Sequence, residues 1–314
     1  MSCSTSTRCF RFSMLVICCG LMVGSLGIST QAAGDGKLRI IVFGAHPDDC
    51  EIRVGGTAAK WAKLGHQVKF VSTTNGDVGH ATMAGGPLAQ RRTKEVQDAA
   101  KILGIETQVL DIHDGEIMPT LENRRTIIRL IREWNADIVI TNRPNDYHPD
   151  HRYTSILVQD AAYMVTVPFL CTDVPYLKKN PVFLYWADRF QKPILFQPDI
   201  VIGIDDVIDQ KYSALDCIES QFYEFGCGGV DPSKWIKKDD AKRLAFLKER
   251  FRFKVLDPWR PILEEFYGIE PAKQIENVEA FEICEYGRRP SKEELRENCS
   301  RSFRIIRGSP KPSE

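Results

Sequence analysis

Short apolar segments alternate with segments of helical periodicity over the first half of the chain, and this alternation limits the fold more than any other feature. Strands are predicted at residues 38–43, 68–72, 108–110 and 137–141, and helices between them at 56–64, 88–103 and 122–134. Strands joined through helices pair in parallel, because the helix carries the chain back to the edge of the sheet where the strand began. The sequence therefore predicts an α/β fold: a Rossmann-like, mostly parallel sheet flanked by helices.

The second half of the chain is less regular. Residues 168–198 are rich in proline and aromatic residues, and we expect an irregular insertion there with one strand at 182–186. The remaining predicted elements are helices at 152–164, 207–222 and 241–253 and strands at 199–204 and 278–285. The predicted domain spans residues 34–285, and a charged C-terminal extension, residues 286–314, follows it.

The first 33 residues have the pattern of a secretory signal peptide. Arg8 and Arg11 precede a mostly apolar stretch, residues 12–28, and small residues at 30–33 suit cleavage. We therefore expect export to the periplasm or the cell exterior. The alternative is that the same segment stays attached as an N-terminal anchor. No later segment of the sequence is long and apolar enough for a membrane span.

The charge balance excludes some classes of partner. The 42 basic residues match 42 acidic ones, and loss of the signal peptide removes two arginines, which leaves a net charge of −2. Such a chain has no basic excess for nucleic acid or an anionic membrane. The mature chain keeps six widely spaced cysteines with no CxxC pair, so the sequence fixes no disulfide pairing and a thiolate zinc site is not expected. They are Cys50, Cys171, Cys217, Cys227, Cys284 and Cys299.

Two His-Pro-Asp units carry the residues with metal-ligand chemistry. The first, His46-Pro47-Asp48-Asp49, follows the strand predicted at 38–43, and the second, His148-Pro149-Asp150-His151, lies in the polar loop after the strand at 137–141. Imidazole and carboxylate groups suit Zn²⁺ and similar divalent ions. If the strand order is 3-2-1-4-5, these strands are neighbours and their loops flank the crevice where the order reverses. The candidate ligands are His46, Asp49, His148 and His151.

Each unit also has a simpler explanation when taken alone. An aspartate at a strand-to-helix turn, such as Asp48 or Asp49, is often only a helix N-cap. A single histidine in a polar loop is usually solvated. Two such units at the ends of two parallel strands favour the metal site over these alternatives.

The same two units resemble the motifs of the PIG-L or LmbE-like family, the zinc-dependent N-acetylglucosaminylphosphatidylinositol deacetylase-like proteins. The likeness covers about residues 38–223, and its weaker parts are Gly55-Gly56-Thr57, Gly65-His66-Gln67-Val68, Arg92-Thr93-Lys94-Glu95 and the segment from Lys211 to Ser220-Gln221. The resemblance implies a hydrolase that removes an N-acetyl group from an amino sugar or its conjugate by attack of a zinc-bound water. Another divalent metal such as Fe²⁺ would serve the same ligands.

The resemblance also implies a role for each residue at a matching position. His46, Asp49 and His151 would bind zinc, Asp48 would be the general base, and His148 would stabilise the oxyanion and protonate the leaving amine. Two adjacent carboxylates can divide this work. One stays ionised on the metal, while the other faces a water whose pKa the metal lowers to about 7.

Three further residues are expected around the site. We expect Asp150 to orient one of the loop histidines through a hydrogen bond. Arg92 and Asp114 resemble substrate-side positions that would bind sugar hydroxyls. The alternative for Arg92 is a surface arginine paired with Glu95 one helical turn away.

Two positions depart from the family pattern. Cys50 stands where the family usually has an acid directly after its aspartate pair, and we expect this cysteine to be a packing residue. Ile218 stands where the last helix usually has a histidine, so a substrate contact at this position is in doubt. The irregular middle matches nothing specific in the family.

Two other classes of function compete with an enzyme of this type. One is a non-catalytic, exported carbohydrate-binding protein that retains the metal pocket. The presence of Asp48 beside the ligands argues against it, because binding alone needs no base. The other is a Rossmann-type enzyme that uses a nucleotide or a methyl donor, but the first turn lacks the Gly-x-Gly-x-x-Gly pattern and has carboxylates where a phosphate would lie.

Overall fold

The computed structural model describes residues 36–224, 235–237 and 242–295. The predicted signal segment, residues 1–33, and the last part of the predicted tail, from residue 296, lie outside these ranges. Export therefore stays a prediction. Within the described ranges, no helix combines the length and the apolar character that crossing a membrane requires.

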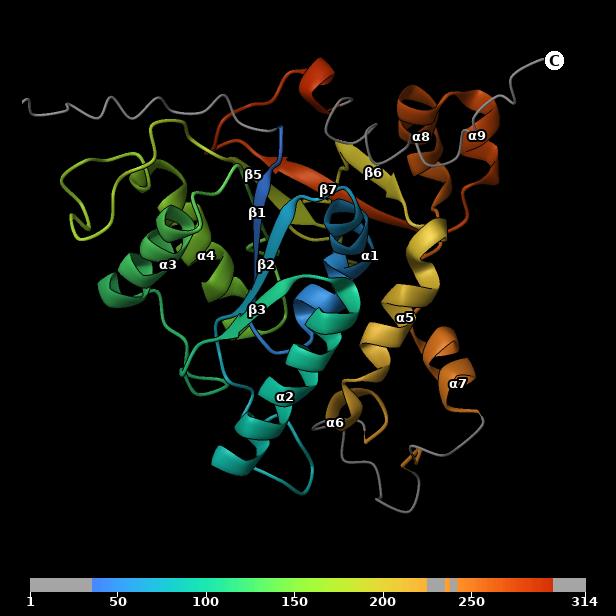
Figure 1. Cartoon of the computed structure of the whole chain (residues 1–314), viewed down its shortest axis with the longest axis horizontal. Helices are drawn as coiled ribbons and strands as arrows, with labels where there is room; N and C mark the ends of the chain where they lie inside the picture. The colour runs from blue at the N-terminus through green and yellow to red at the C-terminus, as the bar shows by residue number, and fades with distance from the viewer. Residues whose placement is uncertain (1–35, 225–234, 238–241, 296–314) are drawn as a thin grey trace, which may run out of the picture. The chain divides into compact units, whose positions relative to one another are not determined.

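A seven-stranded sheet in the order β3-β2-β1-β4-β5-β7-β6 forms the centre of the domain (Figure 1). Its strands are β1 (Arg39–Gly44), β2 (Gln67–Ser72), β3 (Glu106–Val109), β4 (Ile138–Thr141), β5 (Val182–Trp186), β6 (Ile200–Gly203) and β7 (Val278–Cys284). The strands from β3 to β5 pair in parallel, and β7 is antiparallel to both of its neighbours. The predicted mostly parallel sheet is confirmed, and its first five strands have the order 3-2-1-4-5 that was supposed for the grouping of the candidate ligands.

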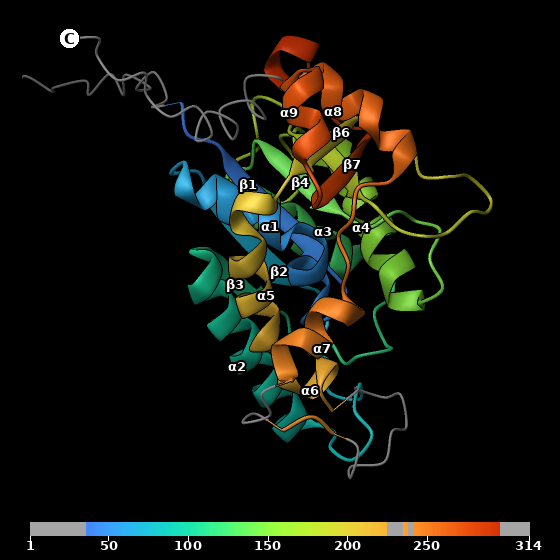
Figure 2. The ribbon, with the colours of Figure 1, turned by 90° about the vertical axis from the view of Figure 1, so that its right-hand side faces the viewer.

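Helices cover both faces of the sheet because its central strands are apolar on both sides. In β1, residues 40–43 are fully buried, as expected of a parallel strand covered on two faces. One face packs against α1 (Asp49–Lys63), α2 (Gly86–Leu103) and α5 (Ile208–Asp216), and the other against α3 (Leu121–Glu133) and α4 (Pro149–Met164). Figure 1 shows the two groups of helices on opposite sides of the strands, and Figure 2 shows α1 and α5 in front of them.

Two helices begin earlier than their sequence patterns predict, and this changes the setting of the candidate ligands. The helix predicted from residue 56 begins at Asp49, and the one predicted from residue 152 begins at Pro149. The first turn of each helix is polar, so the apolar periodicity starts only after it. Proline suits the first helical position, where its missing N–H has no partner to lose. His151 therefore lies in a helix and not in a loop.

The C-terminal part contains more helix than predicted. The helix predicted at 207–222 is divided into α5 and α6 (Glu219–Phe222), after a 3₁₀ turn at Asp205–Val207, and α7 (Arg243–Arg250) replaces the one predicted at 241–253. Two short helices, α8 (Arg260–Tyr267) and α9 (Ile269–Gln274), follow a 3₁₀ turn at Asp257–Trp259 and were not predicted. Leu263 and Ala272 of these helices pack on residues of β6 and β7.

A buried ion pair links β7 to α1 and α5. The Glu279 carboxylate accepts the backbone N–H groups of Gly56 and Thr57, at 2.8 and 2.7 Å. Lys211 Nζ lies 2.5 Å from Glu279 Oε1 and 2.7 Å from the carbonyl oxygen of Ile52. The Lys211 side chain has no exposure to solvent, and burial lowers its pKa to about 8 in spite of the neighbouring carboxylate.

We predict that Glu279→Gln destabilises the domain by about 3–5 kcal/mol in the free energy of unfolding, because it leaves the buried charge of Lys211 without its partner. Urea unfolding at neutral pH measures this change. Glu276→Gln is the matched control, since Glu276 pairs with Lys254 on the surface, where little stability is lost. Equal effects of the two substitutions would show that the buried pair does not stabilise the fold.

Candidate metal centre

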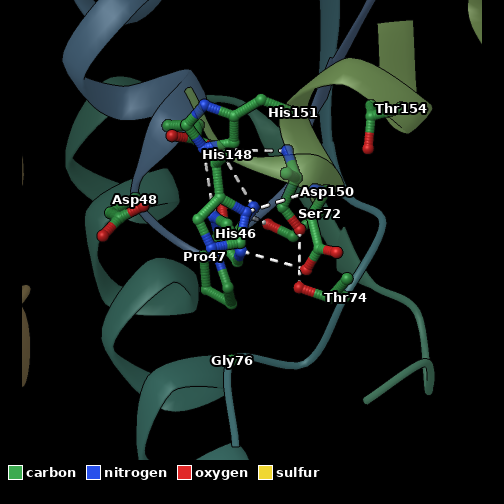
Figure 3. A network of polar contacts seen from close by, with 12 residues as sticks. His46, Pro47, Asp48, Ser72, Thr74, Gly76, His148, Asp150, His151 and Thr154 are labelled. Atoms are coloured by element: carbon green, nitrogen blue, oxygen red, sulfur yellow. Dashed lines mark hydrogen bonds and ion pairs between the residues drawn. The ribbon is translucent and has the colours of Figure 1, made fainter. Parts of the chain in front are cut away.

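The candidate site lies at the edge of the sheet where the parallel strands end. His46 follows β1, Asp114 follows β3, and the segment from His148 to His151 follows β4. Since β1 and β4 are neighbours, His46 and His151 meet although they are 105 positions apart in the chain. Figure 3 shows His46, His148 and His151 gathered in one cluster, with Asp48 to one side.

The Asp49 side chain shapes the turn between β1 and α1. Its Oδ2 atom accepts the backbone N–H groups of Ala45 and His46, both at 2.9 Å. Gly44 permits this close turn, since a Cβ atom there would lie 2.7 Å from Asp49 Cβ. Asp48 occupies the N-cap position but its side chain makes no capping hydrogen bond. The N-cap explanation therefore fails for both aspartates, because Asp49 bonds backwards into the turn.

Three side-chain atoms from this turn and from α4 converge. His46 Nδ1 lies 3.2 Å from His151 Nε2 and 3.7 Å from Asp49 Oδ2, and His151 Nε2 lies 3.5 Å from Asp49 Oδ2. Tetrahedral zinc with bonds of 2.0–2.1 Å would hold its ligand atoms about 3.3 Å apart. The three residues, called the triad below, thus fit a small divalent ion in both donor type and spacing.

Carboxylates hold the other nitrogen of each triad histidine. His46 Nε2 lies 3.0 Å from Asp114 Oδ1 and 3.3 Å from Asp150 Oδ2. His151 Nδ1 lies 3.0 Å from Asp146 Oδ1. A carboxylate behind a ligating imidazole fixes its tautomer and orientation and raises its basicity. Both histidines are therefore arranged to present one defined nitrogen to an ion.

The carboxylates also dominate the electrostatics of the triad. Burial by itself lowers the pKa of His46, but the hydrogen bonds with Asp114 and Asp150 raise it to about 10. Burial lowers the pKa of His151 as well, and Asp49 and Asp146 outweigh it, so the net direction is upward. The pKa of Asp49 is lowered because the two histidines outweigh its burial. The site therefore favours positive charge.

A second possible ligand group shares His46 and adds His148 and Asp150. In that group Asp150 Oδ2 lies 3.3 Å from His46 Nε2, and Asp114 already holds that nitrogen at 3.0 Å. The buried Oδ1 atom of Asp150 has no hydrogen-bond partner. The triad suits an ion better, because its three ligand atoms all face one another and both imidazoles have carboxylates behind them.

Asp48 lies beside the triad and is held by Arg92. The Arg92 guanidinium is buried and its Nη2 atom lies 3.1 Å from Asp48 Oδ2, while other hydrogen bonds run to the carbonyl oxygens of Gly76 and Pro47. Burial raises the pKa of Asp48; Arg92 opposes this and Asp49 adds to it. The expected alternative for Arg92, a surface pair with Glu95, is wrong, since Glu95 bonds to Ser220.

The remaining expected site residues take the following positions. Asp114 contacts His46, so its expected role toward sugar hydroxyls, like that of Arg92, stays a prediction. We expected Asp150 to orient one of the loop histidines. Its carboxylate, in the first turn of α4, instead lies 3.3 Å from His46 Nε2. Only its backbone N–H reaches His148, at Nδ1 and 3.2 Å.

The two positions that depart from the family pattern are packing residues. Cys50 is buried, and its Sγ atom lies near the carbonyl oxygens of Val42 and Val71, as expected for a packing cysteine. Cys50, Cys171 and Cys284 are free thiols. Ile218 is fully buried among apolar side chains that include Leu215, so it makes no polar contact toward a substrate.

Sequence reasoning missed Asp146. Its carboxylate contacts His151 Nδ1 and also accepts the backbone N–H of His148 at 3.0 Å. These contacts outweigh the effect of burial, so the pKa of Asp146 is lowered. The available signal was its place two residues before His148 in a loop without another acid. Its contact with His151 could not be predicted, because the sequence pattern begins the helix at residue 152, whereas α4 begins at Pro149.

We predict that Asp146→Asn weakens zinc affinity about 10–100-fold while the fold is kept. An amide can still accept one hydrogen bond, but it lacks the charge that makes His151 a better ligand. Competition with a chromophoric chelator measures the affinity. Asp160→Asn, on the surface of α4 and paired with Arg124, is the control. An unchanged affinity would mean that Asp146 does not support the ligand.

Comparisons with known proteins agree on one family. Residues 41–162 match the family described as GlcNAc-PI de-N-acetylase (PIG-L). The chain is 31% identical over 198 residues to the diacetylchitobiose deacetylase of Thermococcus kodakarensis, covering 59% of this chain and 71% of that protein. It is 26% identical over 192 residues to the 4-oxalmesaconate hydratase of Pseudomonas putida, covering 58% and 73%.

A solved structure supports the likeness of fold. The N,N'-diacetylchitobiose deacetylase from Pyrococcus horikoshii aligns with a TM-score of 0.58 at 21% identity, over 79% of this chain and 84% of that one. At this level of identity the match concerns the fold alone.

Proposed function

This chain belongs to the GlcNAc-PI de-N-acetylase (PIG-L) family, and from this premise we propose that it is a metal-dependent hydrolase that removes an N-acetyl group from an amino sugar or its conjugate. The observation that carries the proposal is the triad, with its spacing for a small ion, beside the partly buried carboxylate of Asp48. A bound divalent ion such as Zn²⁺ supplies a positive charge that polarises an amide carbonyl and acidifies water. The deacetylase from Thermococcus kodakarensis is named for an amino-sugar substrate of this kind.

Asp48 is the proposed general base. Its raised pKa makes this carboxylate a better acceptor for a proton from water. Arg92 holds one oxygen of the carboxylate at 3.1 Å and so limits its rotation. The substrate amide would lie between Asp48 and the histidine cluster.

His148 is the proposed partner of the developing oxyanion. Its Nδ1 atom accepts the backbone N–H of Asp150, so the proton of the neutral imidazole is on Nε2. Burial and the neighbouring positive charges of His46 and His151 lower the pKa of His148, which favours this neutral form. An Nε2–H donor of this kind stabilises an oxyanion more than it stabilises the amide carbonyl.

The test is acetate release by the zinc-loaded mature protein from a panel of N-acetylated sugars and cell-envelope glycans. The glycans are included because an exported protein would meet them. We expect release from at least one of them, and loss of that release after chelation. Hydration of an unsaturated carboxylic acid, without acetate release from any sugar, would instead favour the hydratase chemistry. A zinc-loaded protein that binds these sugars and transforms none of them would be a carbohydrate-binding protein.

A further inference from the structure

An exposed tyrosine stands at the rim of the candidate site. The Tyr147 side chain is 75% exposed, and its ring lies edge-on to two histidines of the cluster. Its centroid is 5.7 Å from that of His148, at 84° between the planes, and 5.8 Å from that of His151, at 77°. A single exposed aromatic residue on a protein surface is ordinary. This one contacts both a proposed ligand and a proposed catalytic residue.

The backbone that carries Tyr147 is held firmly. Arg152 donates hydrogen bonds to the carbonyl oxygens of Asp146 and Tyr147, at 2.8 and 2.9 Å. The Asp146 carboxylate accepts the N–H of His148 from the other side. The backbone from which the ring projects is therefore held by the segment that also positions the histidines, which is the arrangement a binding residue needs.

A second aromatic ring lies next to Tyr147. The Phe190 centroid is 6.2 Å away, with the two planes tilted by 43°. A buried ion pair fixes its backbone, because Arg143 donates to the Phe190 carbonyl oxygen and Asp188 accepts the Phe190 N–H. Arg143 and Asp188 themselves are paired at 2.6 Å, and each side chain is 4% exposed. Two rings from separate segments are thus held together at the rim.

We propose that Tyr147, supported by Phe190, forms a subsite for the sugar ring that is attached to the N-acetylated one, with the apolar face of that ring packed on the tyrosine. This inference rests on the proposed deacetylase function. The amide must lie within reach of the triad and Asp48, whereas Tyr147 stands at the exposed rim, where its ring contacts those of His148 and His151. A flat aromatic face exposed to water is a surface on which the C–H face of a pyranose ring can be buried.

The test compares substrates with one and two rings. With the zinc-loaded protein, N-acetylglucosamine and N,N'-diacetylchitobiose serve as probes, and kcat and KM are measured from acetate release. Tyr147→Ala should lower kcat/KM for the two-ring probe about three- to tenfold, through KM, and leave the one-ring probe unchanged. Tyr147→Phe should keep the wild-type ratio, because it keeps the aromatic face.

The control is Phe169→Ala, since Phe169 is 94% exposed beyond the far end of α4. An equal loss for both probes in Tyr147→Ala would show a structural role and overturn the proposal, as would no loss for either. Calorimetric binding of the two-ring sugar tests the subsite without turnover: weaker binding by Tyr147→Ala supports it, and equal binding contradicts it. Absence of acetate release from the wild-type protein would count against the proposed function alone.

Discussion

An Asp48→Asn protein is expected to keep its fold and its metal but to hydrolyse its substrate about 10²–10⁴ times more slowly. Asparagine has nearly the same shape, and its carbonyl oxygen can still accept the hydrogen bond from Arg92. It cannot take a proton from water, and this is the function assigned to Asp48. The measurements are kcat on a substrate found by the acetate screen and metal content by elemental analysis.

Asp98→Asn is the matched control for this prediction. Asp98 is an exposed carboxylate of α2 that pairs with Lys94 and Lys101, away from the site, so its loss should leave kcat unchanged. If Asp48→Asn retains full activity, another carboxylate near the triad is the base. Loss of metal together with activity would instead mean that Asp48 supports metal binding, and the division of work between Asp48 and Asp49 would be wrong.

The second large effect is expected for His151→Ala, which should reduce metal content from about one ion per chain to almost none and abolish activity. A catalytic zinc site needs three protein ligands, and removal of one imidazole leaves only two. The control is His148→Ala, which should keep the metal because His148 lies outside the triad and contacts His46 only ring to ring, at 4.6 Å.

The opposite result is equally informative. Loss of metal in His148→Ala with retention in His151→Ala would identify the second group, His46, His148 and Asp150, as the metal site. The roles assigned to the two histidines would then be exchanged. Retention in both variants would mean that neither group holds the ion.

The sheet could be predicted well because the pattern within each short segment indicates its strand or helix. The β-branched run of β1 and the helices between the strands indicate parallel pairing, and the supposed order 3-2-1-4-5, which the structure has, brings His46 next to His151. The candidate metal ligands that follow β1 and β4 could also be predicted from the sequence. What decided these predictions was the position of each polar unit immediately after an apolar strand.

Other features depend on contacts that no local pattern reveals. The first turns of α1 and α4 are polar, so their hydrophobic periodicity starts late and His151 was placed in a loop. Arg92 has the spacing of a surface residue, yet the fold buries it against Asp48. The role of Asp146 depends on its contact with His151, a side chain in the first turn of α4. In each case tertiary burial overrides the pattern within the segment.

The contact between Glu279 and α1 has a consequence for the timing of biosynthesis. Gly56 and Glu279 are 223 positions apart, yet the carboxylate completes the hydrogen bonding of the helix that begins at Asp49. Contacts so distant along the chain form late in folding. Until residue 279 has been synthesised, α1 lacks the hydrogen bonds that Glu279 accepts from Gly56 and Thr57. We therefore expect that an ion held by the triad would be bound only after nearly the whole domain has been synthesised.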